Sequence, residues 1–165
     1  MNACIRPKLR TPFLTRGRKQ QKGVAAVEFA LVAPLLLLIL LGLAQFGWLL
    51  GNYVMVVNAA SSGARYFASQ RGTSTPYSST QSQVSTSAGL LKTSNLSIAT
   101  SVNGVACSTD SSCATDLTSA GGTSAVGTAS VTVTYTFAPL FKGSLSGLYA
   151  MMPTALNASA VERVQ

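Results

Sequence analysis

The sequence contains no histidine and only four carboxylates among its 165 residues. Without histidine there is no Ser-His-Asp triad and no histidine-rich metal site, and four scattered acids offer little for general acid–base catalysis. Charged residues make up 10% of the chain, against about a quarter in an average soluble domain, while 47% of the residues are hydrophobic. These deficits indicate a non-catalytic, membrane-attached protein that needs no cofactor. The four acids are Glu28, Asp110, Asp116 and Glu162.

The basic residues are concentrated at the N-terminus, where seven of the twelve precede Gly23 and no acid accompanies them. Membrane proteins keep such basic segments in the cytoplasm, so the N-terminus is predicted to be cytoplasmic and the C-terminal region external. Beside a membrane span, a basic segment is better suited to orientation and to anionic lipid than to nucleic acid. Membrane lipid is therefore expected as a partner, and nucleic acid is not.

Residues 29–50 form an uncharged run of 22 residues, which includes seven consecutive Leu or Ile residues from Leu35 to Leu41. At about 1.5 Å per residue, a helix of this length crosses the roughly 30 Å hydrocarbon layer. A secretory signal peptide has a similar pattern but a shorter apolar core of about 7 to 15 residues. The run therefore predicts one transmembrane helix, with a bend at Pro34.

One glutamate, Glu28, lies at the start of this uncharged helix, five residues after Gly23. A charge inside a membrane costs on the order of 3 kcal/mol or more, so such acids usually have partners. The alternative is a solvated Glu28 at the headgroup boundary, near a helix N-terminus that favours negative charge. Cleavage after Gly23 would create a new amino group at Val24 and make Glu28 the fifth residue of the mature chain.

Residues 23–67 resemble the TadE-like domain of minor pilins, or pseudopilins, from tight-adherence, Flp-type pilus systems. The resemblance is carried by Gly23, Ala26-Val27-Glu28-Phe29-Ala30-Leu31, Pro34, Asn58-Ala59-Ala60 and Gly63-Ala64-Arg65. Gln45 and Trp48 depart from it, since many relatives carry an acidic and a basic residue there.

The resemblance implies that an aspartyl prepilin peptidase cleaves between Gly23 and Val24, with Glu28 and Phe29 as recognition residues. The charges separately suggest that these residues also pair subunits, since Glu28 of one subunit can neutralise the Val24 ammonium of another in an environment of low dielectric. The implied location is the bacterial inner membrane, with a periplasmic C-terminus and a possible later place in the pilus. The implied partners are the peptidase, other pilins and minor pilins, and the inner-membrane assembly platform.

Helical periodicity continues beyond the membrane to about Gln70, with an apolar stripe predicted to hold the outer domain: Tyr53, Val57, Ala60, Ala64 and Phe67. The segment from Gly72 to Pro76 is predicted to end this helix. The predicted organisation is a cleaved leader over residues 1–23, a long helix over 24–71 and an external domain over 72–165.

The external domain predicts an antiparallel sheet. Residues 96–102 and 105–109 alternate around Asn103-Gly104, the strongest short signal for a hairpin. Further strands are predicted at residues 128–137 and 156–164. Helices are indicated at 83–91 and by the spacing of apolar residues over 141–152. The fold class is α+β, a long N-terminal helix with a small sheet packed on its outer half.

Cys107 and Cys113 enclose a short polar segment in the part of the chain expected to be outside, where disulfides form. A disulfide is the preferred interpretation and free thiols the alternative, because two sulfurs without histidine do not make a zinc site. The neighbouring acids Asp110 and Asp116 are expected to be solvated.

Two classes of function remain from the sequence. One is a processed minor pilin whose helix inserts among other pilin helices. The other is an unprocessed single-pass membrane protein with an extracytoplasmic binding domain. Cleavage after Gly23 distinguishes the two.

Overall fold

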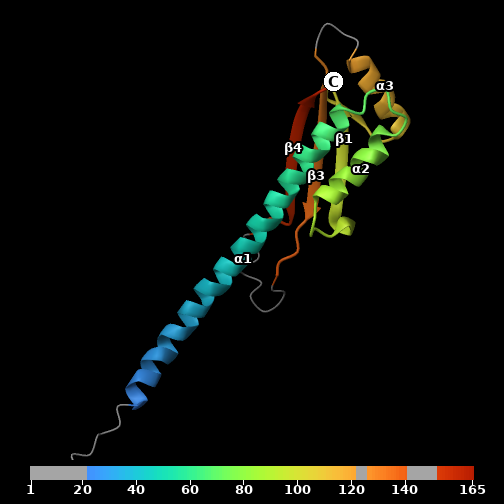
Figure 1. The fold of residues 1–165 in the computed structure, drawn as a ribbon. Coiled ribbons are helices and arrows are strands. Elements are labelled where there is room, and N and C mark those ends of the chain that lie inside the picture. Colours follow the sequence, from blue (N-terminus) through green and yellow to red (C-terminus); the bar gives the residue numbers. More distant parts are fainter. Residues whose placement is uncertain (1–21, 122–125, 141–151) are drawn as a thin grey trace, which may run out of the picture. The chain divides into compact units, whose positions relative to one another are not determined.

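The computed structural model describes residues 22–121, 126–140 and 152–165. The chain divides into two units, Met1–Leu40 and Leu41–Gln165. Helix α1 (Lys22–Ala68) has 47 residues and continues through Pro34 (Figure 1). The prediction of one helix from about Val24 to Gln70 is therefore confirmed to within two residues at each end.

A second helix, α2, covers Pro76–Ser87 and not 83–91 as expected from the sequence. Helix α1 ends at Ala68, just before the segment from Gly72 to Pro76 that was predicted to end it. Pro76 itself lies in the first turn of α2, where the N–H that proline lacks would have no partner within the helix. Gly72 and Gly89 have φ angles of 81° and 59°, a left-handed conformation that glycine adopts without strain. These two glycines lie in the turns on either side of α2.

The predicted hairpin is confirmed as β1 (Leu96–Val102) and β2 (Val105–Cys107), after a short 3₁₀ helix η1 (Thr93–Asn95). Asn103 and Gly104 both have positive φ, at 52° and 82°, as a type I′ turn requires. The second strand ends at Cys107, two residues earlier than predicted.

Helix α3 (Asp110–Ala120) replaces the polar loop that the sequence was expected to form around Asp110. Its N-cap is Thr109, whose Oγ1 accepts a hydrogen bond from Ser112 N at 3.3 Å, while Thr109 N donates to Ser112 Oγ at 3.3 Å. This reciprocal pair is a capping box with serine in the third position.

The sheet is completed by β3 (Thr128–Thr136) and β4 (Ala155–Arg163). All neighbours are antiparallel and the strand order is β2-β1-β3-β4 (Figure 1). The α+β architecture and its four strands are thus confirmed. The helical spacing over 141–152 falls almost entirely outside the described residues, and Met152 itself is not helical.

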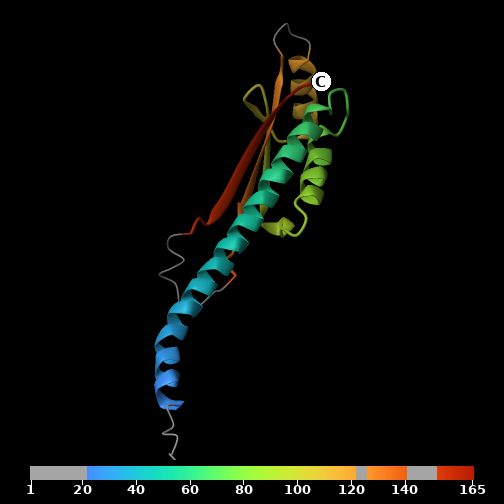
Figure 2. The same cartoon turned by 60° about the vertical axis from the view of Figure 1, so that its left-hand side comes forward.

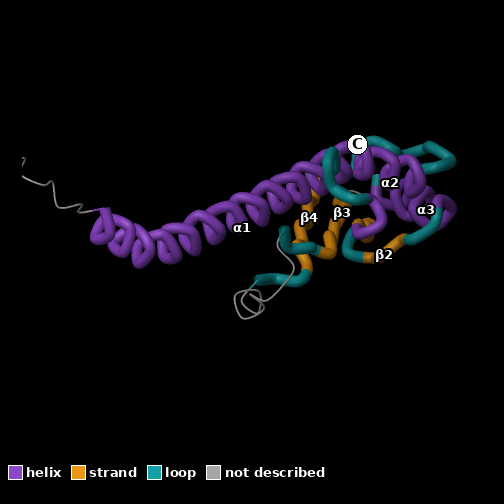
Figure 3. The backbone as a smooth tube through the Cα atoms, turned by 90° about the horizontal axis from the view of Figure 1, so that it is seen from below, coloured by secondary structure: helices purple, strands orange, loops and turns teal. Residues whose placement is uncertain are grey.

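In the second unit, the three helices cover one face of the sheet (Figures 2 and 3). Alternate residues of β3 are buried on that face, Ala129, Val131, Val133 and Tyr135. The opposite face carries hydroxyl pairs between strands. Ser101 and Ser130 share a hydrogen bond of 2.6 Å between their hydroxyls. The single core therefore lies between the sheet and the helices.

The face of α1 that contributes to this core is rotated from the predicted one. Tyr53 and Val57 are 45% and 38% exposed, whereas Val56 and Ala59 are fully buried. Successive residues of a helix point about 100° apart, so a shift of one position moves the buried stripe to another side. The prediction was right only for the last three positions, Ala60, Ala64 and Phe67.

Candidate functional site

The predicted cleavage and pairing residues all lie in the first turns of α1. The helix begins at Lys22, so the bond between Gly23 and Val24 lies within its first turn. Val24 is 62% exposed, Phe29 is 71% exposed and Glu28 is exposed as well. A side chain added at Gly23 would meet nothing within 4 Å.

Glu28 and Val24 are four residues apart, which places them one above the other on the same helical face. Helical side chains lean toward the N-terminus, so the Glu28 side chain leans toward the turn that contains Val24. Any amino group created at Val24 would therefore lie on the same face of the helix as the carboxylate. Both residues of the predicted pair therefore lie on one exposed face of the helix, where a second subunit could reach them.

The helix that follows is apolar on all sides and largely uncovered. The six residues from Leu35 to Leu40 are each between 49% and 62% exposed. Among the described residues, one helix is long and apolar enough to cross a membrane, with a mean hydropathy of 2.7 over its most apolar stretch. Such a surface requires lipid or other apolar helices around it.

The outer half of α1 packs closely against the sheet and α2 because its inward residues are small. Ala59, Ala60 and Ala64 are at most 1% exposed. A Cβ on Gly63 would collide with the Val84 side chain of α2 and come within 3.3 Å of Val131 on β3. The alanines and glycine of the motif at residues 58–65 therefore have a structural role.

Gln45 and Trp48 connect α1 to the chain segments that flank the strands. Gln45 is 4% exposed and its Nε2 donates to the sulfur of Met152 at 3.6 Å. Trp48 donates from its indole nitrogen to the carbonyl oxygen of Ala138 at 3.3 Å. These two side chains thus make uncharged contacts within the second unit.

The sulfurs of Cys107 and Cys113 are bonded, which joins the end of β2 to the first turns of α3. Asp110 is not simply solvated as expected. Its carboxylate accepts hydrogen bonds from the backbone nitrogens of Tyr77 and Ser78, at 2.8 and 2.9 Å, and from the Ser78 hydroxyl at 2.9 Å. These contacts, led by the Ser78 backbone, lower the pKa of Asp110 below its ordinary value of 3.8.

This contact was missed by the sequence analysis, although Thr109 followed three residues later by Ser112 was an available signal for the start of α3. Within the described ranges, no cluster of acidic or sulfur ligands is suited to a metal ion. The acid on α3 therefore has an architectural role, since it caps the exposed N-terminus of α2.

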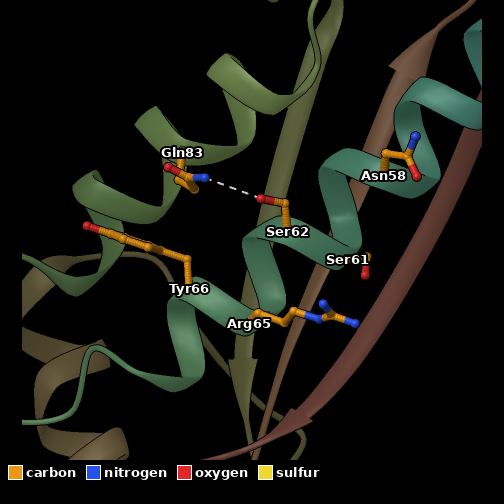
Figure 4. Close-up of a pocket in the computed structure, with 6 residues that line it drawn as sticks. All are labelled: Asn58, Ser61, Ser62, Arg65, Tyr66 and Gln83. Atoms are coloured by element: carbon orange, nitrogen blue, oxygen red, sulfur yellow. Dashed lines mark hydrogen bonds between the residues drawn. The ribbon is translucent and has the colours of Figure 1, made fainter.

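A groove whose lining residues all carry polar groups lies along the outer face of α1 where it meets α2 (Figure 4). Its volume is about 530 Å³ and it is open to solvent. Five of its residues are spaced so that they follow one face of α1, and the sixth comes from α2. They are Asn58, Ser61, Ser62, Arg65, Tyr66 and Gln83. Sequence reasoning did not identify this groove, because it did not predict that α2 packs beside α1. It also began α2 at residue 83 and not at Pro76.

Residues 23–65 match the family model of TadE-like proteins. No curated protein and no solved structure matches the chain. The resemblance inferred from the sequence is thus confirmed over these residues, which lie within α1. The family is not known for enzymatic activity. The match and the apolar helix together indicate a membrane-anchored protein that is associated with a tight-adherence pilus and with its components.

Proposed function

We propose that the protein is a minor pilin, or pseudopilin, that takes part in assembling a Flp-type pilus after a prepilin peptidase cleaves the bond between Gly23 and Val24. The observation that carries the proposal is Glu28, a single acid on an exposed apolar helix, one turn from the predicted new amino group. The TadE-like match over the same stretch supports it. The protein acts by assembly and not as an enzyme.

Charge pairing is the mechanism that we assign to Glu28. In an environment of low dielectric, opposite charges attract far more strongly than in water. Glu28 of one subunit neutralises the Val24 ammonium of another and so fixes the axial register of neighbouring helices. Phe29, 71% exposed beside this acid, adds an apolar contact to the partner helix.

The proposed location follows from charge and hydropathy. The basic leader, residues 1–23, stays on the cytoplasmic side of the inner membrane, and residues 29–50 cross it. The domain formed by residues 72–165 is periplasmic, where oxidation of Cys107 and Cys113 is permitted. The partners are the peptidase, other pilins and minor pilins, the assembly platform and membrane lipid.

The direct test of processing is the intact mass of the protein expressed with and without the prepilin peptidase. We expect the mass to fall by that of Met1–Gly23 only when the peptidase is present. Gly23→Leu should block the loss, since Gly23 forms one side of the proposed cleavage site. The substitution should leave the helix intact, because the added side chain has free space around it. Gly47→Leu is the matched control, because Gly47 is equally uncrowded but distant from the bond. Retention of the leader beside an active peptidase would favour the unprocessed membrane protein.

The pairing step has its own test. Among chains that have lost the leader, those with Glu28→Leu should enter assemblies poorly, because the Val24 ammonium would then lack its counter-charge. Glu28→Asp keeps the charge and should retain part of the incorporation. Equal incorporation of Glu28→Leu and the wild type would refute charge pairing.

A further inference from the structure

Some of the side chains that line the groove on α1 make no contact that the fold requires. The motif at residues 58–65 has an inward half, the small residues that pack in the core, and an outward half that includes Asn58 and Arg65. Asn58 and Ser61 make no side-chain hydrogen bond to the part of the chain that the structure describes. The packing of the domain therefore leaves these donors available.

On its α2 side, the groove is held in place by hydrogen bonds between α1 and α2. Ser62 Oγ accepts a hydrogen bond from Gln83 Nε2 at 3.2 Å (Figure 4). It also accepts one from Ser87 Oγ at 2.9 Å. Both donors belong to α2 and the acceptor belongs to α1. A site whose walls are already held together loses less conformational entropy when a ligand binds.

The charge of the groove favours an anion. Its six lining residues include one cation, Arg65, and no acid, and most of the others are hydroxyl or amide donors. Among the described residues, Arg65 has one ion-pair partner, Glu162 on β4, at 3.4 Å between Nε and Oε1. The remaining guanidinium nitrogens can form a two-pronged contact with a planar carboxylate.

The existing ion pair is weak enough to be replaced. The side chains of Arg65 and Glu162 are 76% and 41% exposed, and exposed pairs contribute little to stability. Their single contact is longer than the usual charge-assisted hydrogen bond of about 2.7 to 2.9 Å. A ligand carboxylate with better geometry can therefore replace Glu162 as the partner of Arg65.

We propose that this groove binds a carboxylate-bearing segment of a neighbouring pilus subunit, with Arg65 as the anchor and Glu162 as its replaceable internal partner. The identity of the occupant as a pilus subunit rests on the proposed function. The preference for a carboxylate rests only on the residues of the groove. A neutral segment would offer the guanidinium no negative charge to replace that of Glu162.

The first test uses the full-length protein in detergent micelles, titrated with a blocked tetraglutamate peptide and, as a control, with tetraglutamine. We expect tetraglutamate alone to shift the NMR signals of Arg65 Nε and of the Ser61 and Tyr66 amides, more strongly at low salt. Glu162→Gln should raise the affinity about two- to five-fold, the range expected for removing an exposed competing ion pair.

Two arginine variants separate an anchor from a general charge effect. Arg65→Gln should abolish the shifts, and Arg65→Lys should leave weaker binding because the planar fork is lost. Arg163→Gln removes the same charge from an exposed residue outside the groove and should change nothing. Equal shifts with tetraglutamine, or binding that survives Arg65→Gln, would overturn the proposal.

The occupant is tested in cells by a photo-crosslinking residue placed at Ser61. The expected adduct joins this position to an acidic peptide of a pilus subunit, grows with Glu162→Gln and disappears with Arg65→Gln. An adduct with lipid would contradict a subunit as the occupant. An adduct unaffected by Arg65→Gln would contradict Arg65 as the anchor. The micelle titration does not depend on cleavage, so failure of processing and failure of the groove are distinguishable.

Discussion

Asp110 is the first residue of α3, yet its carboxylate binds the first turn of α2. Because these hydrogen bonds lower its folded pKa, the charged form stabilises the fold above the unfolded pKa. That contribution is lost as the pH falls through the folded pKa, below about 4. Asp110→Asn should therefore melt at a lower temperature at pH 7 and differ less from the wild type at pH 3.

Thermal melting followed by circular dichroism in micelles measures this effect. The matched control is Asp116→Asn, which changes an acid of the same helix that has no hydrogen bond within the described ranges. If both variants lost equal stability at pH 7, the capping role of Asp110 would be wrong.

Gly63 is required by close packing, whereas Gly51 is not. A methyl group at Gly63 would be forced against Val84, a rigid and fully buried β-branched side chain. Gly63→Ala should therefore lower the free energy of unfolding by about 1 to 3 kcal/mol. Gly51→Ala adds the same methyl group where nothing lies within 4 Å, and should be neutral or slightly stabilising. Denaturant unfolding in micelles would show the contrast, and equal effects would contradict this packing.

At the scale of elements, the sequence predicted those whose signals are local and repeated. The hairpin followed from Asn103-Gly104 between alternating residues, and β3 from an alternation that spans residues 128–137. The helices α2 and α3 were misplaced or missed because serine and threonine rank low as helix formers. Helix α2 begins with Pro76 and helix α3 with the Thr109 cap, and both of these signals are visible in the local sequence. The contact of Asp110 with α2 joins residues far apart in the chain, so the local sequence does not indicate it.

The disulfide is the second constraint on α3, because it fixes the start of the helix to the end of β2. Closing a loop of this length stabilises a fold by about 2 kcal/mol in the chain-entropy account. The double variant Cys107→Ser, Cys113→Ser should therefore unfold at lower denaturant concentration. The double variant and the reduced wild type are each compared with the oxidised wild type. If neither unfolded at a lower denaturant concentration than the oxidised wild type, the disulfide would contribute nothing to stability.

At the scale of the whole molecule, the sequence identified the apolar helix, its basic leader and the acid between them, because each is a contiguous feature. It did not identify the groove on α1, since that site requires α2 beside α1 and β4 near Arg65. Residues from different elements meet there only through the tertiary fold.

The account depends on a subunit that loses its leader and enters a fibre. N-terminal sequencing of this protein recovered from sheared pili tests both at once. We predict a chain that begins at Val24. A chain that begins at Met1, or the absence of the protein from fibres that contain other processed subunits, would contradict the account.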